Sequence, residues 1–195
     1  MLILLRTSVK EKRLGLYYYF EDQVKRLPAT EQCIWDRTAQ YTWRETHAHA
    51  NRYAQFFISL GVQPHELVAF YLTNSPEFVL ALLGTWAIGT APAMINYNLA
   101  GEGLLHCLRT SSAKVMLVDE DSEIRARIEE VRDKVEGDLG IRIVVLDAAK
   151  KAEIMALEPK RPENSYRDGT LPSDPMGLFY TRCVITESTR ALPKS

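Results

Sequence analysis

The feature that most constrains the fold of this chain is a repeated alternation of short apolar runs with longer amphipathic segments. Residues 66–72, 115–118 and 142–147 are almost continuously apolar at their centres, which is typical of strands covered on both faces of a parallel sheet. Residues 90–95 and 176–181 also have strand character. Alternating strands and helices are joined by right-handed crossovers. We therefore expect an α/β fold, with a mainly parallel sheet flanked by helices on both sides.

The segments between these runs carry apolar residues at three- and four-residue spacing, which predicts helices. Ser75 and Pro76 suit a helix start, and Leu27 before Pro28 suits a helix end. Two short extended pieces, residues 32–36 and 40–43, predict a hairpin. Prolines and charges predict an irregular connection over residues 158–175. The predicted helices cover residues 16–26, 44–60, 75–88, 100–112, 120–137 and 148–157, the fifth with a buried stripe of Ile124, Ile128, Val131 and Val135.

Composition excludes several classes of function. The chain has 195 residues, with 24 Lys plus Arg against 25 Asp plus Glu, so no field of one sign favours nucleic acid as a partner. Cys33, Cys107 and Cys183 are far apart and form no CxxC or Cys/His spacing, which argues against a disulfide framework or a zinc site. We expect reduced thiols in an intracellular protein.

The apolar stretches do not predict a signal peptide or a membrane span. The first five residues are apolar but Arg6 follows at once, so the run is too short for either. Residues 78–101 carry no charge, yet Gly84, Gly89 and Pro92 interrupt them. A buried helix, a turn and a strand account for this stretch better.

Several short motifs resemble a known family. The end of the last predicted strand, Tyr180-Thr181, resembles the strand that precedes the phosphate loop of the adenylate-forming (AMP-binding) superfamily. Residues 95–99 and 101–107 resemble its narrower branch, the fatty-acid transport proteins and very-long-chain acyl-CoA synthetases. The resemblance extends from about Leu16 to Thr181, and its other motifs lie at residues 41–45, 74–78 and 84–89.

This resemblance implies the N-terminal subdomain of an enzyme with a two-step reaction. A fatty acid attacks ATP to give an acyl-adenylate and pyrophosphate, and the thiol of coenzyme A then takes the acyl group. ATP, Mg²⁺ and CoA are thus the implied cofactors, and fatty acid and CoA the implied partners. The family also implies membrane association, at the endoplasmic reticulum, the peroxisome or the plasma membrane.

The segment after Tyr180 departs from the family's glycine-rich phosphate loop. Residues 182–195 contain no glycine, and the β-branched Val184 and Ile185 suit a tight turn with positive φ poorly. Remnants of the loop's hydroxyls and lysine are Thr181, Ser188, Thr189 and Lys194. We expect no effective phosphate binding by this chain, and we assign it no catalytic or metal-binding residue.

Other polar residues are interpreted as structural. His47 and His49 lie on a predicted helix, where packed or solvent-facing histidines are common. His106 and Cys107 are neighbours on a helix and point about 100° apart, so they do not form a thiol–imidazole pair. Asn96 and Asn98 follow a predicted strand, where turn chemistry is the simpler interpretation.

These observations divide the chain into a flexible N-terminus (1–15), an incomplete N-terminal AMP-binding-type domain (16–181) and an aberrant tail (182–195). The first hypothesis is an inactive N-terminal fragment of a long-chain or very-long-chain fatty acid–CoA ligase. The alternative is a non-catalytic protein that acts through a partner or a membrane, since unpaired sheet edges favour association, including self-association or aggregation. A third hypothesis is an independent ligand-binding module. The change of character at residues 182–191, before Leu-Pro-Lys returns, favours the first, with a retained intron or a frame error in the tail.

Overall fold

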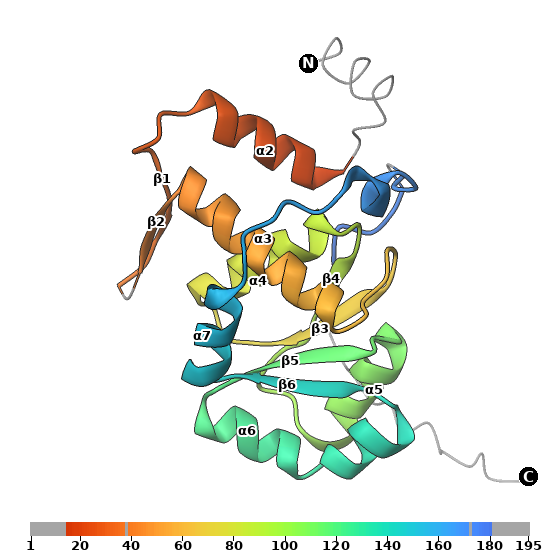
Figure 1. The fold of residues 1–195 in the computed structure, drawn as a ribbon. Helices are drawn as coiled ribbons and strands as arrows, with labels where there is room; N and C mark the ends of the chain where they lie inside the picture. The colour runs from red at the N-terminus through yellow and green to blue at the C-terminus, as the bar shows by residue number, and fades with distance from the viewer. Residues whose placement is uncertain (1–14, 38, 172, 181–195) are drawn as a thin grey trace, which may run out of the picture.

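A parallel five-stranded sheet forms the centre of the computed structural model, which describes residues 15–37, 39–171 and 173–180 (Figure 1). The strand order is β6-β5-β3-β4-β7, and every pair of neighbours is parallel. This confirms the predicted α/β class. The strands are β3 (Leu67–Tyr71), β4 (Ala91–Met94), β5 (Val115–Asp119), β6 (Arg142–Leu146) and β7 (Leu178–Phe179).

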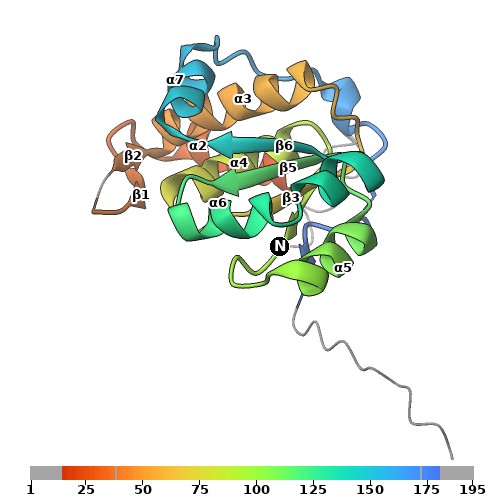
Figure 2. The ribbon, with the colours of Figure 1, turned by 90° about the horizontal axis from the view of Figure 1, so that it is seen from below.

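Helices cover both faces of this sheet (Figures 1 and 2). One face, here called the α4 face, is covered by α3 (Trp43–Ser59), α4 (Pro76–Ala87) and α7 (Ala148–Ala156), with α2 (Leu16–Arg26) outside α3 and α4. The other, the α5 face, is covered by α5 (Gly101–Ser111) and α6 (Ser122–Glu129).

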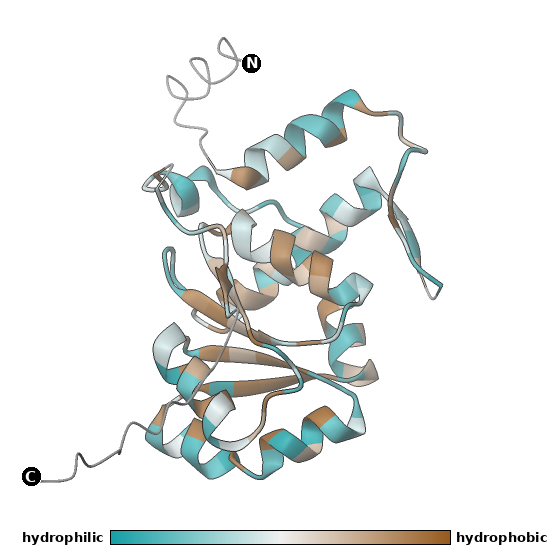
Figure 3. Ribbon diagram, turned by 180° about the vertical axis from the view of Figure 1, so that it is seen from behind, coloured by the Kyte–Doolittle hydropathy of each residue, from teal (hydrophilic) through white to brown (hydrophobic). Residues whose placement is uncertain are grey.

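Successive side chains of each strand supply two separate cores, because a strand points alternate residues to opposite faces. On β5, Val115 and Leu117 belong to the core of the α4 face, whereas Met116 and Val118 belong to the core of the α5 face. This is why the strands are apolar at their centres, as Figure 3 shows for the middle of the sheet.

The helix starts follow the capping chemistry of the sequence. The Ser75 hydroxyl accepts a hydrogen bond from the Phe78 amide at 3.3 Å, and Pro76 is the first residue of α4, as predicted. α3 begins one residue earlier than expected, because Thr42 and Glu45 form a reciprocal capping box.

The helix predicted over residues 120–137 was wrong as a single element. α6 ends at Glu129, and a π-helical turn, η1 (Lys134–Asp138), follows after a break. The predicted stripe is nevertheless buried, including Val131 and Val135. The wider turn keeps Val135 on the core while the chain turns toward β6, where the Ile141 amide donates to the Val135 carbonyl at 3.0 Å.

The two remaining irregular regions largely match expectation. The hairpin of β1 (Gln32–Trp35) and β2 (Gln40–Thr42) is an antiparallel ribbon separate from the main sheet. In the connection over residues 158–175, the described residues form only one short 3₁₀ turn, η2 (Asn164–Arg167). The last predicted strand is shorter than expected, since only Leu178 and Phe179 pair with β4.

Candidate functional site

The carboxyl edge of the sheet contains a topological switch point between the adjacent strands β3 and β5. α4 follows β3 and packs on one face, whereas α6 follows β5 and packs on the other. The two loops therefore diverge and leave a crevice, which is where open α/β sheets bind ligands. A pocket of about 290 Å³ lies there.

The polar groups of this carboxyl-edge pocket mostly bind one another. Asp119, at the end of β5, accepts hydrogen bonds from the Thr73 amide (3.0 Å) and hydroxyl (2.6 Å) and from the Asp121 amide (3.0 Å). Partial burial of Asp119 opposes ionisation, but these hydrogen bonds outweigh it and lower the pKa of the carboxyl group. The Lys151 ammonium pairs with Glu120 at 2.8 Å. The polar groups that line the pocket are thus largely occupied by hydrogen bonds and an ion pair within the protein.

The charge of the same pocket does not fit a triphosphate. Four carboxylates and a single lysine line it, and this excess of negative charge repels phosphate. In addition, the described part of the chain brings no three His, Cys, Asp or Glu side chains together as a metal site. The carboxylates that line the carboxyl-edge pocket are Asp36, Glu77, Asp119 and Glu120.

β7, the edge strand at the end of the sheet opposite β6, also brings the chain to the carboxyl edge. It lies parallel to β4, with Ala93 beside Leu178 and Met94 beside Phe179. Tyr180, the last described residue, donates its hydroxyl hydrogen to the Cys107 carbonyl of α5 at 2.8 Å. The last described residue therefore lies at this edge of the sheet. The predicted phosphate-loop remnants, Thr181, Ser188, Thr189 and Lys194, lie outside the described residues.

The isolated polar candidates have structural surroundings. Asn96 accepts a hydrogen bond from the Asn98 amide at 2.9 Å, which is the predicted turn chemistry. Cys107 is fully buried in the core of the α5 face, whereas His106 is exposed, so the two do not form a catalytic pair. His47 lies 3.1 Å from the Tyr17 hydroxyl, in contact with α2.

A buried polar cluster on the α4 face was not predicted from the sequence. Arg167 is only 1% exposed; its guanidinium donates to the carbonyls of Ala87 and Pro162 and lies 4.8 Å from the ring centre of Tyr17. Glu21 is 5% exposed and pairs with Arg161 through bonds of 2.5 and 2.9 Å. These contacts fix the connection to α2 and α4, and so position β7.

Desolvation and charge act in opposite directions on Glu21. Burial opposes its ionisation, but hydrogen bonds from His47 and Arg161, with the Arg161 charge, lower the pKa of Glu21 to about 2. The carboxylate is therefore ionised at neutral pH. No sequence motif marks it, because its partner is far away along the chain.

Within residues 15–37, 39–171 and 173–180, no helix combines the length and apolarity required to cross a bilayer.

The comparisons with known proteins agree on one family. The AMP-binding enzyme family matches residues 20–181. Isopenicillin N epimerase component 1 of Hapsidospora chrysogena is 32% identical over 165 residues, which is 84% of this chain and 27% of that protein. Long-chain fatty acid transport protein 1 of Rattus norvegicus is 32% identical over 165 residues, 80% of this chain and 24% of that protein. The chain thus spans about a quarter of the length of these relatives.

A solved structure supports the same fold. The N-terminal domain of FACL13 from Mycobacterium tuberculosis superposes with a TM-score of 0.73 at 20% identity, over 86% of this chain and 42% of that one. The predicted resemblance to the AMP-binding superfamily is confirmed.

Proposed function

Because this chain belongs to the AMP-binding enzyme family, we propose that it forms the N-terminal part of a fatty acid–CoA ligase. The observation that carries the proposal is the position of β7. Its parallel pairing with β4 brings Tyr180 to the carboxyl edge of the sheet, and Tyr180-Thr181 resembles the end of the strand that precedes the family's phosphate loop. In such a ligase the described region is the scaffold that positions the loop.

The proposed reaction has two steps. A fatty acid carboxylate attacks ATP to give an acyl-adenylate and pyrophosphate; the thiol of CoA then takes the acyl group and releases AMP. The contributions of the described residues are positional. Tyr180 is tied to α5, and Arg167 and Trp86 tie the connection before β7 to α4, with the Trp86 indole donating to the Met176 carbonyl at 2.8 Å.

We propose further that the 195-residue chain does not carry out this reaction alone. The carboxyl-edge pocket presents carboxylates rather than phosphate-binding groups, and residues 182–195 contain no glycine to close backbone N–H groups around phosphate. Thr181, Ser188, Thr189 and Lys194 would supply hydroxyls and one charge, which do not replace such a loop.

The proposal of a fatty acid substrate rests on residues 95–99 and on the similarity to the fatty acid transport protein of Rattus norvegicus. The similarity to isopenicillin N epimerase component 1 is equal in identity, so a different carboxylic acid is the competing substrate class. Association with a membrane is also part of the proposal, and it rests on the same resemblance to the fatty acid transport branch.

A fusion protein tests the assignment. Residues 16–180 of this chain would replace the matching segment of the rat protein, with the intact rat protein as positive control. Fatty-acid-dependent ATP–pyrophosphate exchange and acyl-CoA formation are the measurements. We expect both activities in the fusion and neither in the 195-residue chain.

Two results would count against the proposal. A folded fusion that exchanges pyrophosphate only with a non-fatty carboxylic acid, such as isopenicillin N, would contradict the substrate class. Exchange by the 195-residue chain itself would contradict its inactivity.

One observation favours the alternative of a non-catalytic binding protein. Leu171, Met176 and Phe179 are 58%, 60% and 65% exposed; Phe179 lies on the edge strand β7 and the other two lie in the connection before it. An apolar, unpaired edge favours association with another protein. Sedimentation velocity of the chain separates the two: a soluble, concentration-dependent complex that Phe179→Lys abolishes would favour the binding function.

A further inference from the structure

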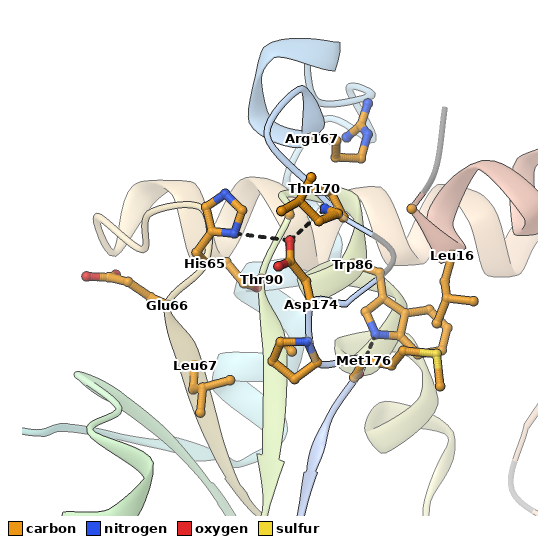
Figure 4. A pocket seen from close by; sticks show the side chains of 15 residues that line it. Leu16, His65, Glu66, Leu67, Trp86, Thr90, Arg167, Thr170, Asp174 and Met176 are labelled. Carbon is orange, nitrogen blue, oxygen red and sulfur yellow. Dashed lines mark hydrogen bonds and ion pairs between the residues drawn. The ribbon is translucent and has the colours of Figure 1, made fainter. Parts of the chain in front are cut away.

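A second cavity, of about 230 Å³, lies at the amino edge of the sheet, opposite the carboxyl-edge pocket (Figure 4). The starts of β3 and β4, the end of α4 and the connection before β7 surround it. Nothing in the proposed ligase reaction uses this edge. It is large enough for a small organic molecule rather than for a few waters.

Most of the wall is apolar. Leu67 and Ala91 come from the first positions of β3 and β4, and Met176 comes from the segment before β7. The Trp86 indole forms one side, and its hydrogen bond to the Met176 carbonyl fixes the plane of the ring. Such a surface suits an aromatic or alkyl body, which gains free energy by leaving water.

One carboxylate points into this apolar space. The Asp174 Oδ2 atom accepts the Leu171 amide at 2.8 Å and lies 3.6 Å from His65 Nδ1. Its other oxygen, Oδ1, accepts no hydrogen bond from the described residues. The side chain is 27% exposed, and Figure 4 shows it projecting between His65 and Trp86. It therefore offers an acceptor already oriented by two neighbours.

The other charges of the lining leave this acceptor dominant. Glu66 pairs with Lys114 outside the cavity. Arg167 also belongs to the lining, but its guanidinium is directed away from Asp174, toward the rings of Tyr17 and Tyr18 at 4.8 and 5.0 Å. The Asp174 carboxylate is thus the acidic group that faces a ligand, and it is complementary to a cation.

We propose that this amino-edge cavity binds a small organic amine as its ammonium ion, carried on an aromatic or short alkyl body. The ammonium donates to Asp174 Oδ1, and the apolar body packs against the Trp86 indole between Leu67 and Ala91. The proposal is independent of the ligase assignment, because it uses the opposite edge of the sheet.

The test is a titration of the full 195-residue chain with phenethylammonium, followed by the NMR shifts of the Trp86 indole N–H and of the Leu67 and Ala91 amides. Two probes of matched size serve as controls, neutral 2-phenylethanol and anionic 3-phenylpropionate. We expect saturable shifts at these three positions with the amine, roughly tenfold weaker binding of the alcohol, and no binding of the acid.

Substitutions locate the recognition. Asp174→Asn should reduce the affinity for the amine to that for the alcohol, whereas Asp138→Asn, at an exposed position on η1, should leave it unchanged. Leu16→Trp, which fills the cavity from its rim, should abolish all three shifts and serves if Asp174→Asn does not fold. The proposal is overturned if no probe binds, if the three probes bind alike, or if the preference for the amine survives Asp174→Asn.

Discussion

The two faces of the sheet are built differently. The core of the α5 face is made of apolar side chains such as Leu104, Leu108 and Met116. The α4 face also buries a large apolar core, but both buried charged side chains that the structure describes, Glu21 and Arg167, lie on it. Apolar packing is tolerant of small changes in geometry, whereas hydrogen-bonded charges require one arrangement. The difference indicates that the α4 face fixes the path of the connection toward β7, and the α5 face supplies general stability.

The largest test of this difference is removal of the buried guanidinium. Arg167→Ala leaves the Ala87 and Pro162 carbonyls and the Asn164 side chain without their donor, and it opens a void beside Tyr17. We expect a loss of about 3 to 4 kcal/mol in the free energy of unfolding. Urea denaturation measures it.

The control for Arg167 is Arg125→Ala, at an exposed position of α6, for which a change within about 0.5 kcal/mol is expected. A similarly small loss for Arg167→Ala would show that the cluster does not hold the connection.

The second test uses pH. Because the pKa of Glu21 in the folded protein, about 2, lies below its ordinary value of 4.5, its contribution is complete above about pH 4.5 and is lost as the pH falls toward 2. That contribution amounts to about 3 kcal/mol. In Glu21→Gln the decline in stability between pH 6 and pH 3 should be smaller by about 2 kcal/mol. Urea unfolding at a series of pH values measures this.

A matched substitution on the other side is Glu129→Gln, which removes an exposed ion pair with Arg132 on the α5 side. Its pH dependence should stay close to that of the unaltered chain. Equal effects of the two glutamines would remove the distinction between the faces.

The third test compares two helical glycines. A Cβ added at Gly84 of α4 would lie 2.7 Å from the Tyr53 Cβ and 3.1 Å from the Ala50 carbonyl oxygen of α3, so Gly84→Ala must force the helices apart. A Cβ at Gly103 of α5 meets only Leu99, at 3.6 Å. We expect Gly84→Ala to destabilise by about 2 kcal/mol and Gly103→Ala to be neutral or stabilising by about 0.5 kcal/mol. Thermal unfolding followed by circular dichroism would reveal the reverse order if the account is wrong.

The smallest expected effect concerns one hydroxyl. The Tyr17 hydroxyl donates a hydrogen bond to the Asn51 side chain at 2.6 Å. Desolvation by burial raises the pKa of Tyr17, and the negative charge of Glu21 raises it further. Tyr17→Phe should cost about 1 kcal/mol. Tyr97→Phe on the α5 face, where the described residues show no hydrogen bond to the hydroxyl, should change the urea midpoint little.

The sequence predicted those features that depend on residues close together along the chain, such as helix caps and buried stripes. Ser75 and Pro76 marked the start of α4, and the buried stripe through Ile124 and Val135 was correct. The break after Glu129 was not predictable, because the same periodicity fits one helix or a helix followed by a π turn.

Contacts distant in sequence account for what was missed. Arg167 lies in a proline-rich connection and gave no signal, since its partner Ala87 lies 80 residues away along the chain. The parallel sheet was predicted, but the switch point between β3 and β5 depends on the strand order, which the local periodicity of the sequence does not specify. The predicted phosphate-loop remnants remain a prediction, because Thr181, Ser188, Thr189 and Lys194 lie outside the described residues.

In the function proposed above, this region is the scaffold of a ligase whose phosphate-binding chemistry lies beyond Tyr180. The most direct measurement is to sequence the transcript from the codon for Tyr180 to beyond that for Ser195. We predict a message that continues in frame and encodes a glycine-rich loop after Tyr-Thr. Transcripts that all end at the codon for Ser195, with no glycine-rich form, would contradict the account and leave a protein that acts by binding.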